Sequence, residues 1–351
     1  MSASNAQAAA FFSDAAAKQG PDYTTLEEQV ESKVPRDRYD RPLIKQPDGS
    51  MEPYNRASSY GGQIEDKTNV EEWTRRQVVR GLAMQPDLLN MVPERLKLDP
   101  WADMERSDKK TLSSISDRAQ DVAGSNLKSA LGTDIHYATE VIDLGDSLED
   151  KLRDFEPQRR ALLIDRANAY YRVVKDYGLV FDSVETFGVQ DEVKVAGTWD
   201  RRGRIPWWRE WNQNILDVKT SGSMDFAGIG FAVQLSTYAH MCAYDHETGE
   251  RIPHEGMNTS EALIIHVERH LGGAVELYPV NISEGWRQAR LAREIILARR
   301  LGKTLIRQLD EREALMRSAT SKVELLELKP QIDTWPPHLR KLANELWALL
   351  P

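Results

Sequence analysis

One short apolar segment carries an acidic and a basic residue. Asp217 and Lys219 stand two positions apart in NILDVKTSG, which is otherwise rich in Ile, Leu and Val. Side chains at positions i and i+2 of a strand point to the same side, so the two charges share one face. Such a pair can serve hydrolytic chemistry, or it can be a structural ion pair at the edge of a sheet. The tripeptide alone fits both interpretations.

A second carboxylate, Asp200, ends the preceding strand-like segment, VKVAGTWD. If the two strands form a hairpin, Asp200 and Asp217 come close together and their charges repel. A divalent cation removes that conflict, and Mg²⁺ and Mn²⁺ bind carboxylate oxygens of this kind. Lys219 beside them can orient or deprotonate a water, or neutralise charge on a phosphate. The three residues therefore predict a site for a divalent metal ion.

The elements that must position these residues are helices and strands in a mixed order. Residues 68–178 are mostly helical in pattern. Three strand-like segments follow, then a helical segment, two more strand-like segments and a long helix. This order predicts an α/β core, with helices covering a central sheet, behind a helical N-terminal region.

Composition divides the chain into four regions. Residues 1–55 are rich in Ala, Ser, Asp and Pro, and they predict a disordered or loosely attached arm. Residues 56–178 form the mainly helical region, and residues 179–318 form the core. Residues 319–351 form a C-terminal extension with a short amphipathic helix, for which docking on the core and docking on a partner are both open.

Two further motifs stand in order around these carboxylates. GTDIHYATE places His136 on an upstream helix, and QLSTY places Gln234 and Tyr238 on the helix that follows. Over about residues 125–300, the ordered set resembles the PD-(D/E)XK nuclease superfamily, in the branch of the RecB nuclease domain and the CRISPR-associated exonucleases. The resemblance implies a restriction-endonuclease-like core, which is a mixed central sheet flanked by helices.

The resemblance also implies a role for each matched residue near the D-x-K segment. His136, Asp200, Asp217 and the backbone carbonyl of Val218 correspond to the ligands of a Mg²⁺ or Mn²⁺ ion. Lys219 corresponds to the catalytic lysine, and the two aspartates belong to the catalytic set with it. His136 suits Mn²⁺ as well as Mg²⁺, since imidazole is a softer ligand than a carboxylate. A structural histidine is the alternative.

Supporting roles follow from the same resemblance. Gln234 and Tyr238 correspond to a pair that lines the DNA path and supports the site, and their i, i+4 spacing puts both on one helical face. Hydrogen bonding within the core is the alternative for this pair. Glu185, on the first strand, is implied as an auxiliary acid. Some relatives hold an iron–sulfur cluster with four cysteines, but Cys242 is the only cysteine here, so no such cluster is expected.

A basic and aromatic segment, RRGRIPWWREWNQ, separates the two aspartates. Bases stack on aromatic rings and arginines meet phosphates, so the segment predicts a grip on single-stranded DNA. The alternative is a hairpin whose tryptophans cap the sheet. A later helix carries a basic stripe that is either solvated or faces phosphates. The DNA-binding candidates are Arg201, Arg202, Arg204, Trp207 and Trp208 in the segment, and Arg287 and Arg290 on the helix.

Composition limits the classes of function. The chain has 351 residues and a formal net charge of −9, which argues against indiscriminate nucleic-acid binding but allows a local basic patch. No apolar run approaches the ~20 residues of a membrane span. The N-terminus fits no signal peptide, and no phosphate-binding loop of a helicase is present. A cytoplasmic protein is expected, in a bacterial host cell if the gene is phage-borne.

The function implied by the resemblance is a metal-dependent deoxyribonuclease, an exonuclease rather than an endonuclease, in DNA recombination, replication or repair. Compact stand-alone members of this branch occur in bacteriophages. DNA ends, single-stranded or duplex, are the expected partner, together with a recombination or replication protein and no membrane. One alternative is a catalytically silent nuclease-like module for DNA binding or assembly. Another is an unrelated metal-dependent enzyme. Polarity, strand preference and oligomeric state stay open.

Overall fold

The computed structural model describes residues 33–220, 224, 228–306, 310–332 and 336–351. The chain divides into two compact units, residues 1–294 and residues 295–351. The division falls inside one helix, α11 (Ile282–Leu305). The predicted boundary at residues 318 and 319 is therefore about one helix too late.

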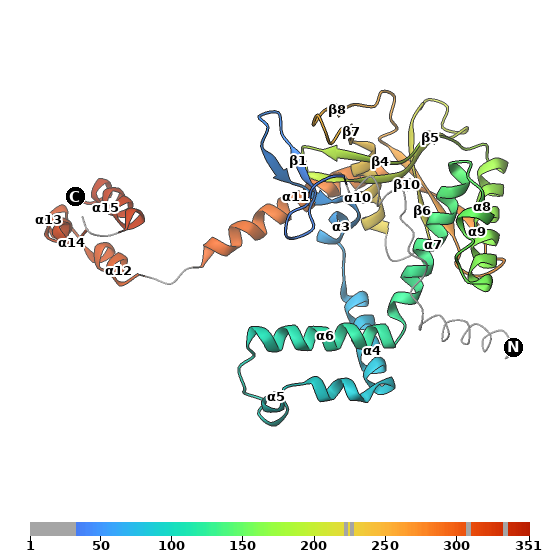
Figure 1. The fold of residues 1–351 in the computed structure, drawn as a ribbon. Helices are drawn as coiled ribbons and strands as arrows, with labels where there is room; N and C mark the ends of the chain where they lie inside the picture. Colours follow the sequence, from blue (N-terminus) through green and yellow to red (C-terminus); the bar gives the residue numbers. More distant parts are fainter. Residues whose placement is uncertain (1–32, 221–223, 225–227, 307–309, 333–335) are drawn as a thin grey trace. The chain divides into compact units, whose positions relative to one another are not determined.

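A mixed sheet forms the centre of the first unit (Figure 1). Its order in the described residues is β10-β9-β6-β5-β4-β7-β8, with β3 beside β5. The β6–β9 and β3–β5 pairs are parallel, and the other pairs are antiparallel. The α/β prediction, with a mixed sheet flanked by helices, is confirmed. The strands are β3 (Asn55–Arg56), β4 (Val180–Gln190), β5 (Val195–Arg204), β6 (Asn214–Lys219), β7 (Cys242–Tyr244), β8 (Arg251–Ile252), β9 (Glu261–Val267) and β10 (Val275–Asn281).

Helices precede, interrupt and follow the sheet. The helical N-terminal region predicted from the sequence is present, with short 3-10 turns η1 (Gly61–Gln63) and η2 (Pro86–Met91) between its helices. The helices up to the end of the first unit are α3 (Ala57–Tyr60), α4 (Thr68–Met84), α5 (Glu94–Leu98), α6 (Arg106–Val122), α7 (Ser125–Asp143), α8 (Leu148–Lys151), α9 (Pro157–Asp176) and α10 (Gly228–Ala239), followed by α11.

The period-2 alternation of β6 and β9 gives the sheet two different faces. Leu216 and Val218 of β6 pack with Leu263 and Ile265 of β9 in one buried cluster with residues of α7 and α9. The alternate residues point the other way, toward α10. The apolar positions thus attach the sheet to α7 and α9, and Asp217 is left on the opposite face.

The α10 face is closed by two helices in close contact. A Cβ atom added to Gly285 of α11 would lie 2.1 Å from the carbonyl oxygen of Ala232 in α10. Only glycine allows the two backbones to approach so closely. The start of α11 is capped by Asn281, whose Oδ1 accepts the backbone N–H of Glu284 at 3.1 Å.

Part of the predicted N-terminal arm belongs to the core. Residues 1–32 lie outside the described residues, but residues 33–55 include a hairpin of β1 (Leu43–Lys45) and β2 (Met51–Pro53). Ile44 and Tyr54 are fully buried and pack with Phe187 and Val189 of β4. A loosely attached arm is therefore the wrong description of residues 33–55, because their few apolar side chains cover the sheet.

The second unit is a small group of helices with its own apolar cluster. Met316, Leu325, Leu339 and Ala343 are buried against one another. The predicted amphipathic helix is α15, and it packs in this cluster. The helices of the unit after α11 are α12 (Glu311–Ser318), α13 (Lys322–Glu327), α14 (Lys329–Ile332) and α15 (Pro337–Leu349).

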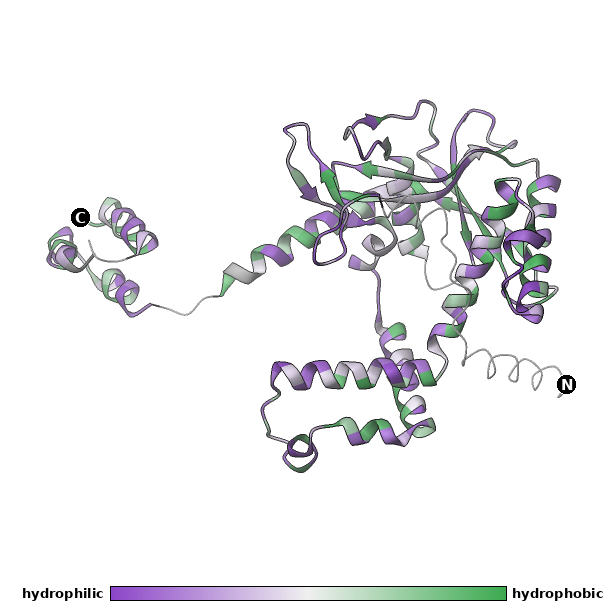
Figure 2. Cartoon of the chain, viewed as in Figure 1, coloured by the Kyte–Doolittle hydropathy of each residue, from purple (hydrophilic) through white to green (hydrophobic). Residues whose placement is uncertain are grey.

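Individual helices carry both polar and apolar residues. Figure 2 shows apolar residues on the strands of the sheet and a mixture of polar and apolar residues along helices such as α6 and α11. Within the part of the chain that the structure describes, no helix has both the length and the apolarity needed to cross a membrane.

Candidate active site

The two predicted carboxylates lie where β5 and β6 separate. Their ladder runs to the pair Arg201–Leu216, and Asp200 and Asp217 come next on each strand. Beyond that point Oδ2 of Asp200 accepts the backbone N–H of Val218 at 2.8 Å. The N–H and C=O of one strand residue point to the same neighbouring strand. The Val218 carbonyl therefore also faces the β5 side, as its predicted role requires.

His136 approaches the same point from α7. Its Nε2 lies 2.8 Å from Oδ2 of Asp200 and 3.7 Å from Oε1 of Glu185 on β4. Gly132, one turn earlier, allows this approach, because a Cβ atom there would lie 2.6 Å from Oγ1 of Thr220 at the end of β6. The helix, β4, β5 and β6 thus converge on one site.

Glu140 is a site residue that the sequence reasoning missed. One ligand atom each from His136, Glu140 and Glu185 lies within 4.8 Å of the other two, a spacing that could hold a metal ion. Glu140 is buried and follows His136 by four residues, so both project from one side of α7. That i, i+4 spacing was a signal available in the sequence.

Lys219 and Asp217 form an ion pair on the α10 face. Nζ of Lys219 lies 2.7 Å from Oδ2 of Asp217, and the lysine side chain keeps 21% of its exposure while the aspartate keeps none. Oδ1 of Asp217 accepts no hydrogen bond from the described residues. The Lys219 ammonium also lies 5.4 Å from the centre of the Phe231 ring. One buried carboxylate oxygen is thus left for a ligand.

Burial and charge shift the protonation of the site. Burial and the charge of Asp200 raise the pKa of Asp217 to about 6, against the effect of Lys219. Burial disfavours ionised Asp200, but the charge and hydrogen bond of His136 hold its pKa well below the usual range. Burial opposes protonation of His136, yet Asp200 and Glu185 raise its pKa to about 9. The two carboxylates thus differ in their proton affinity because they share one site.

These residues suit a hard divalent cation. Four of the five candidate side chains offer carboxylate oxygen, one offers imidazole, and an oxygen of Asp217 is buried without a hydrogen-bond partner among the described residues. Mg²⁺ and Mn²⁺ accept such ligands. A ligating imidazole must be neutral, so ion binding at His136 would release a proton. The five side chains are those of His136, Glu140, Glu185, Asp200 and Asp217.

Gln234 and Tyr238 lie together on α10. Nε2 of Gln234 donates to the Tyr238 hydroxyl at 3.1 Å, as their i, i+4 spacing allows. Tyr238 is buried, and its ring would touch a Cβ atom on Gly197 of β5 at 3.6 Å. Tyr238 therefore supports the strand that carries Asp200 rather than lining a surface. Gln234 is partly buried.

Arg201 is not a surface residue, contrary to its predicted role in DNA binding. The side chain is fully buried, with Nε 2.6 Å from Oδ2 of Asp143 and Nη1 2.9 Å from Oε1 of Glu185. The Tyr170 hydroxyl donates to the same Asp143 oxygen at 2.7 Å. Glu185 itself has φ of +47°, an uncommon conformation for a side-chain-bearing residue. Arg201 therefore holds Glu185 toward the site from inside the core.

Only part of the basic and aromatic segment is exposed. Trp208 is buried in the cluster under α7 and α9, so it cannot stack on a base, and the capping alternative is correct for it. Trp207 is 42% exposed and contacts Trp208 edge-on at 6.2 Å. Nη1 of Arg202 lies 2.6 Å from Nδ1 of His254, and Arg204 is exposed. Trp207 and Arg204 remain available to a nucleic acid.

The basic stripe on α11 is paired with acids. Arg287 contacts Glu284 one turn earlier, with an Nη2–Oε1 distance of 2.6 Å. Nε of Arg290 lies 3.3 Å from Oε1 of Glu192, and its guanidinium lies over the Trp286 ring. Both arginines are exposed, so these are surface pairs that a phosphate could displace.

Comparisons with known proteins add nothing to this geometry: no family model matches the chain, and no curated protein matches its sequence. The class is therefore set by the fold and the site alone, as an α/β protein with a buried cluster of acids, a histidine and a lysine at a split in its sheet.

Proposed function

We propose that this chain is a divalent-cation-dependent deoxyribonuclease of the PD-(D/E)XK type, in the branch of the RecB nuclease domain and the CRISPR-associated exonucleases. One observation carries the proposal. His136, Asp200, Asp217 and Lys219, which come from three separate elements of the chain, meet at the separation of β5 and β6. Exonuclease action on DNA ends, in recombination, replication or repair, is the form that the family resemblance favours.

The side chains divide the work. His136, Asp200 and Asp217, with Glu140 and Glu185 beside them, would hold a Mg²⁺ or Mn²⁺ ion, which when bound polarises a phosphate and lowers the pKa of a coordinated water. Lys219 keeps a cation beside the Asp217 carboxylate and is partly open to solvent. It can orient the attacking water and offset the negative charge that builds on the phosphate.

A silent DNA-binding module is the main alternative, and the buried carboxylates argue against it. Burying an ionised group is costly unless a partner compensates it. Asp217 has a raised pKa and an oxygen without a hydrogen bond from the described residues, beside a second carboxylate. Simple binding gains nothing from such an arrangement, whereas an ion site requires it.

End-labelled DNA digestion tests the proposal. Single-stranded and duplex substrates, with free or blocked ends, are incubated with the protein in Mg²⁺, in Mn²⁺ and in a chelator. We expect metal-dependent cleavage that a blocked end prevents. Lys219→Ala should lower the rate about 10²–10⁴-fold, since one positioned acid or base contributes that much.

The matched control is Lys151→Ala. Lys151 also pairs with an aspartate, with Nζ 3.1 Å from Oδ2 of Asp146, but this pair is exposed. Its variant should cleave like the wild type. DNA binding without cleavage by the wild type in either metal would support the silent module instead. Full activity of a folded Lys219→Ala protein would reject the lysine assignment.

A further inference from the structure

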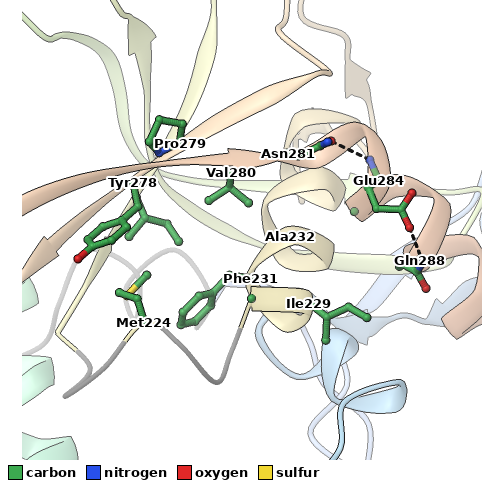
Figure 3. Close-up of a pocket in the computed structure, with 13 residues that line it drawn as sticks. Met224, Ile229, Phe231, Ala232, Tyr278, Pro279, Val280, Asn281, Glu284 and Gln288 are labelled. Carbon is green, nitrogen blue, oxygen red and sulfur yellow. Dashed lines mark hydrogen bonds between the residues drawn. The ribbon is translucent and has the colours of Figure 1, made fainter.

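An apolar pocket adjoins the candidate active site on the α10 face. Its volume is about 450 Å³, within the ~300–1,000 Å³ of small-ligand pockets. The walls come from the start of α10, from β10 at the edge of the sheet and from the first two turns of α11 (Figure 3). Phe231 of α10 lines the pocket and also lies over the Lys219 ammonium, so one side chain borders both sites.

Strand register ties the pocket to the catalytic residues. Asp217 of β6 pairs with Ile264 of β9, and Ile264 pairs with Tyr278 of β10. Residues paired across neighbouring strands lie on the same face, and each strand is ~4.8 Å from the next. Asp217, Ile264 and Tyr278 thus form one row, and two strand spacings put the backbones of Asp217 and Tyr278 roughly 10 Å apart. Ile264 and Tyr278 both line the pocket.

The lining suits a flat and largely apolar group. Tyr278, Phe231, Met224 and Val280 surround one end of the pocket, and three polar residues lie at the other (Figure 3). At the polar end Gln288 donates to Glu284 at 2.6 Å, and Glu284 is anionic. Glu284 is also paired with Arg287, and the carboxylate and amide oxygens at this end can accept a hydrogen bond from an amino group. The polar residues are Asn281, Glu284 and Gln288.

We propose that the pocket binds an unpaired nucleobase of the DNA strand that is cut, next to the scissile phosphate. The inference rests on the nuclease function proposed above and adds a substrate class to it: an end or strand whose terminal bases are not paired. The phosphate would lie at Asp217 and Lys219, and the base beside it would enter over Phe231 and contact the Tyr278 ring. Base–aromatic stacking contributes ~1–3 kcal/mol per base without sequence preference.

This contact is tested by a double-mutant cycle in which Tyr278 is changed in the protein and one base is removed from the DNA. The protein carries Asp217→Asn, so that it binds without cutting. Single-stranded oligonucleotides each lack one base at a different position, and their affinities are measured by fluorescence anisotropy. We expect one position at which base removal weakens binding about 5- to 150-fold, the equivalent of ~1–3 kcal/mol. Tyr278→Ala should weaken binding of the intact oligonucleotide equally, with no further loss when both changes are combined.

Three more variants test whether the Tyr278 ring itself, rather than the residues around it, contributes to binding. Tyr278→Phe removes the hydroxyl that donates to Glu276 but keeps the ring, so it should bind like the parent. Ile229→Trp on the exposed rim should fill the pocket and reproduce the loss even if Tyr278→Ala fails to fold. Leu291→Ala, an exposed position of α11 that does not line the pocket, should change nothing.

The outcomes distinguish this inference from the function on which it rests. If the wild type cleaves DNA but no abasic position matters, or if the losses from Tyr278→Ala and base removal add independently, the pocket does not hold the base. If the wild type neither binds nor cleaves DNA in Mg²⁺ or Mn²⁺, the nuclease proposal fails and the pocket assignment fails with it.

Discussion

Two charged clusters lie on the neighbouring strands β5 and β6 and are built in different ways. In one, Arg201 points toward α7 and α9, is fully buried and contacts Asp143 and Glu185. In the other, Lys219 points toward α10, remains partly exposed and contacts Asp217, whose second oxygen has no hydrogen bond from the described residues. The first cluster, called the closed cluster below, is enclosed in the core, and it shares Glu185 with the candidate ion site. The second keeps an aspartate oxygen without a hydrogen bond from the described residues, which is what the proposed ion site needs.

The contrast teaches how to separate structural charge from functional charge. Both clusters bury carboxylates, and both pair them with a cation. The difference lies in the two aspartates: Oδ2 of Asp143 is bonded by Arg201 and by the Tyr170 hydroxyl, whereas Oδ1 of Asp217 accepts no hydrogen bond from the described residues. A fully satisfied buried network rigidifies a protein, and an incomplete one marks a binding position.

The largest expected effect is on the closed cluster. Arg201→Leu leaves the carboxylates of Asp143 and Glu185 buried without their cation, so the free energy of unfolding should fall by ~3–5 kcal/mol. Denaturant unfolding measures this change. Arg75→Leu is the control, because its pair with Glu71 is exposed and should contribute at most ~1 kcal/mol. Equal effects of the two variants would break the comparison.

Asp217→Asn should raise the free energy of unfolding of the metal-free protein, whereas Arg201→Leu should lower it. The folded-state pKa of Asp217 is raised from 3.8 to about 6, so its stabilising contribution is complete below pH 4 and is lost as the pH rises through 6. Asparagine cannot ionise, so the variant should be more stable than the wild type above pH 6, by up to ~3 kcal/mol. The two should converge near pH 4.

Metal addition sharpens the same experiment. Mg²⁺ or Mn²⁺ should raise the melting temperature of the wild type by mass action, and the rise should be much smaller for Asp217→Asn. Thermal unfolding at pH 8, with the metal or with a chelator, measures the rise in melting temperature for the wild type and for the variant. A variant that is less stable than the wild type at pH 8 in chelator would show that Asp217 is as well compensated as Asp143.

The smallest expected effect concerns the last bond of the closed cluster. Tyr170→Phe removes the hydroxyl that donates to Asp143, and a hydrogen bond to a charged group contributes ~1.5–3 kcal/mol. Its neighbour Tyr171 is 42% exposed, so Tyr171→Phe should change stability by less than ~0.5 kcal/mol. Both are read from denaturant midpoints. No loss in Tyr170→Phe would mean that Arg201 alone completes the cluster.

The main residues of the candidate site could be predicted from local sequence. The D-x-K spacing, the aspartate ahead of it and the helical histidine are short-range features, and the structure brings all four residues together. The α/β order followed from periodicities of 2 and 3.6 residues, which depend only on which side chains are apolar. Glu140 could have been predicted in the same way, since it lies one helical turn after His136.

What the tertiary structure decided was which charges and rings are covered. Arg201 and Arg204 look alike in the sequence, and so do Trp207 and Trp208. Yet Arg201 and Trp208 are buried under α7 and α9, while Arg204 and Trp207 are exposed. Their burial depends on α7 and α9, which are separate elements earlier in the chain, and no local pattern encodes that packing.

The pocket beside Lys219 is also decided by the tertiary structure. Its row of Asp217, Ile264 and Tyr278 exists only because β6 pairs with β9 in one register and β9 with β10 in another. A one-residue slip would turn Ile264 to the other face and remove the row. The sequence by itself determined which charged and polar residues the candidate site could use, and strand register and helix packing decided which of them meet and which remain exposed.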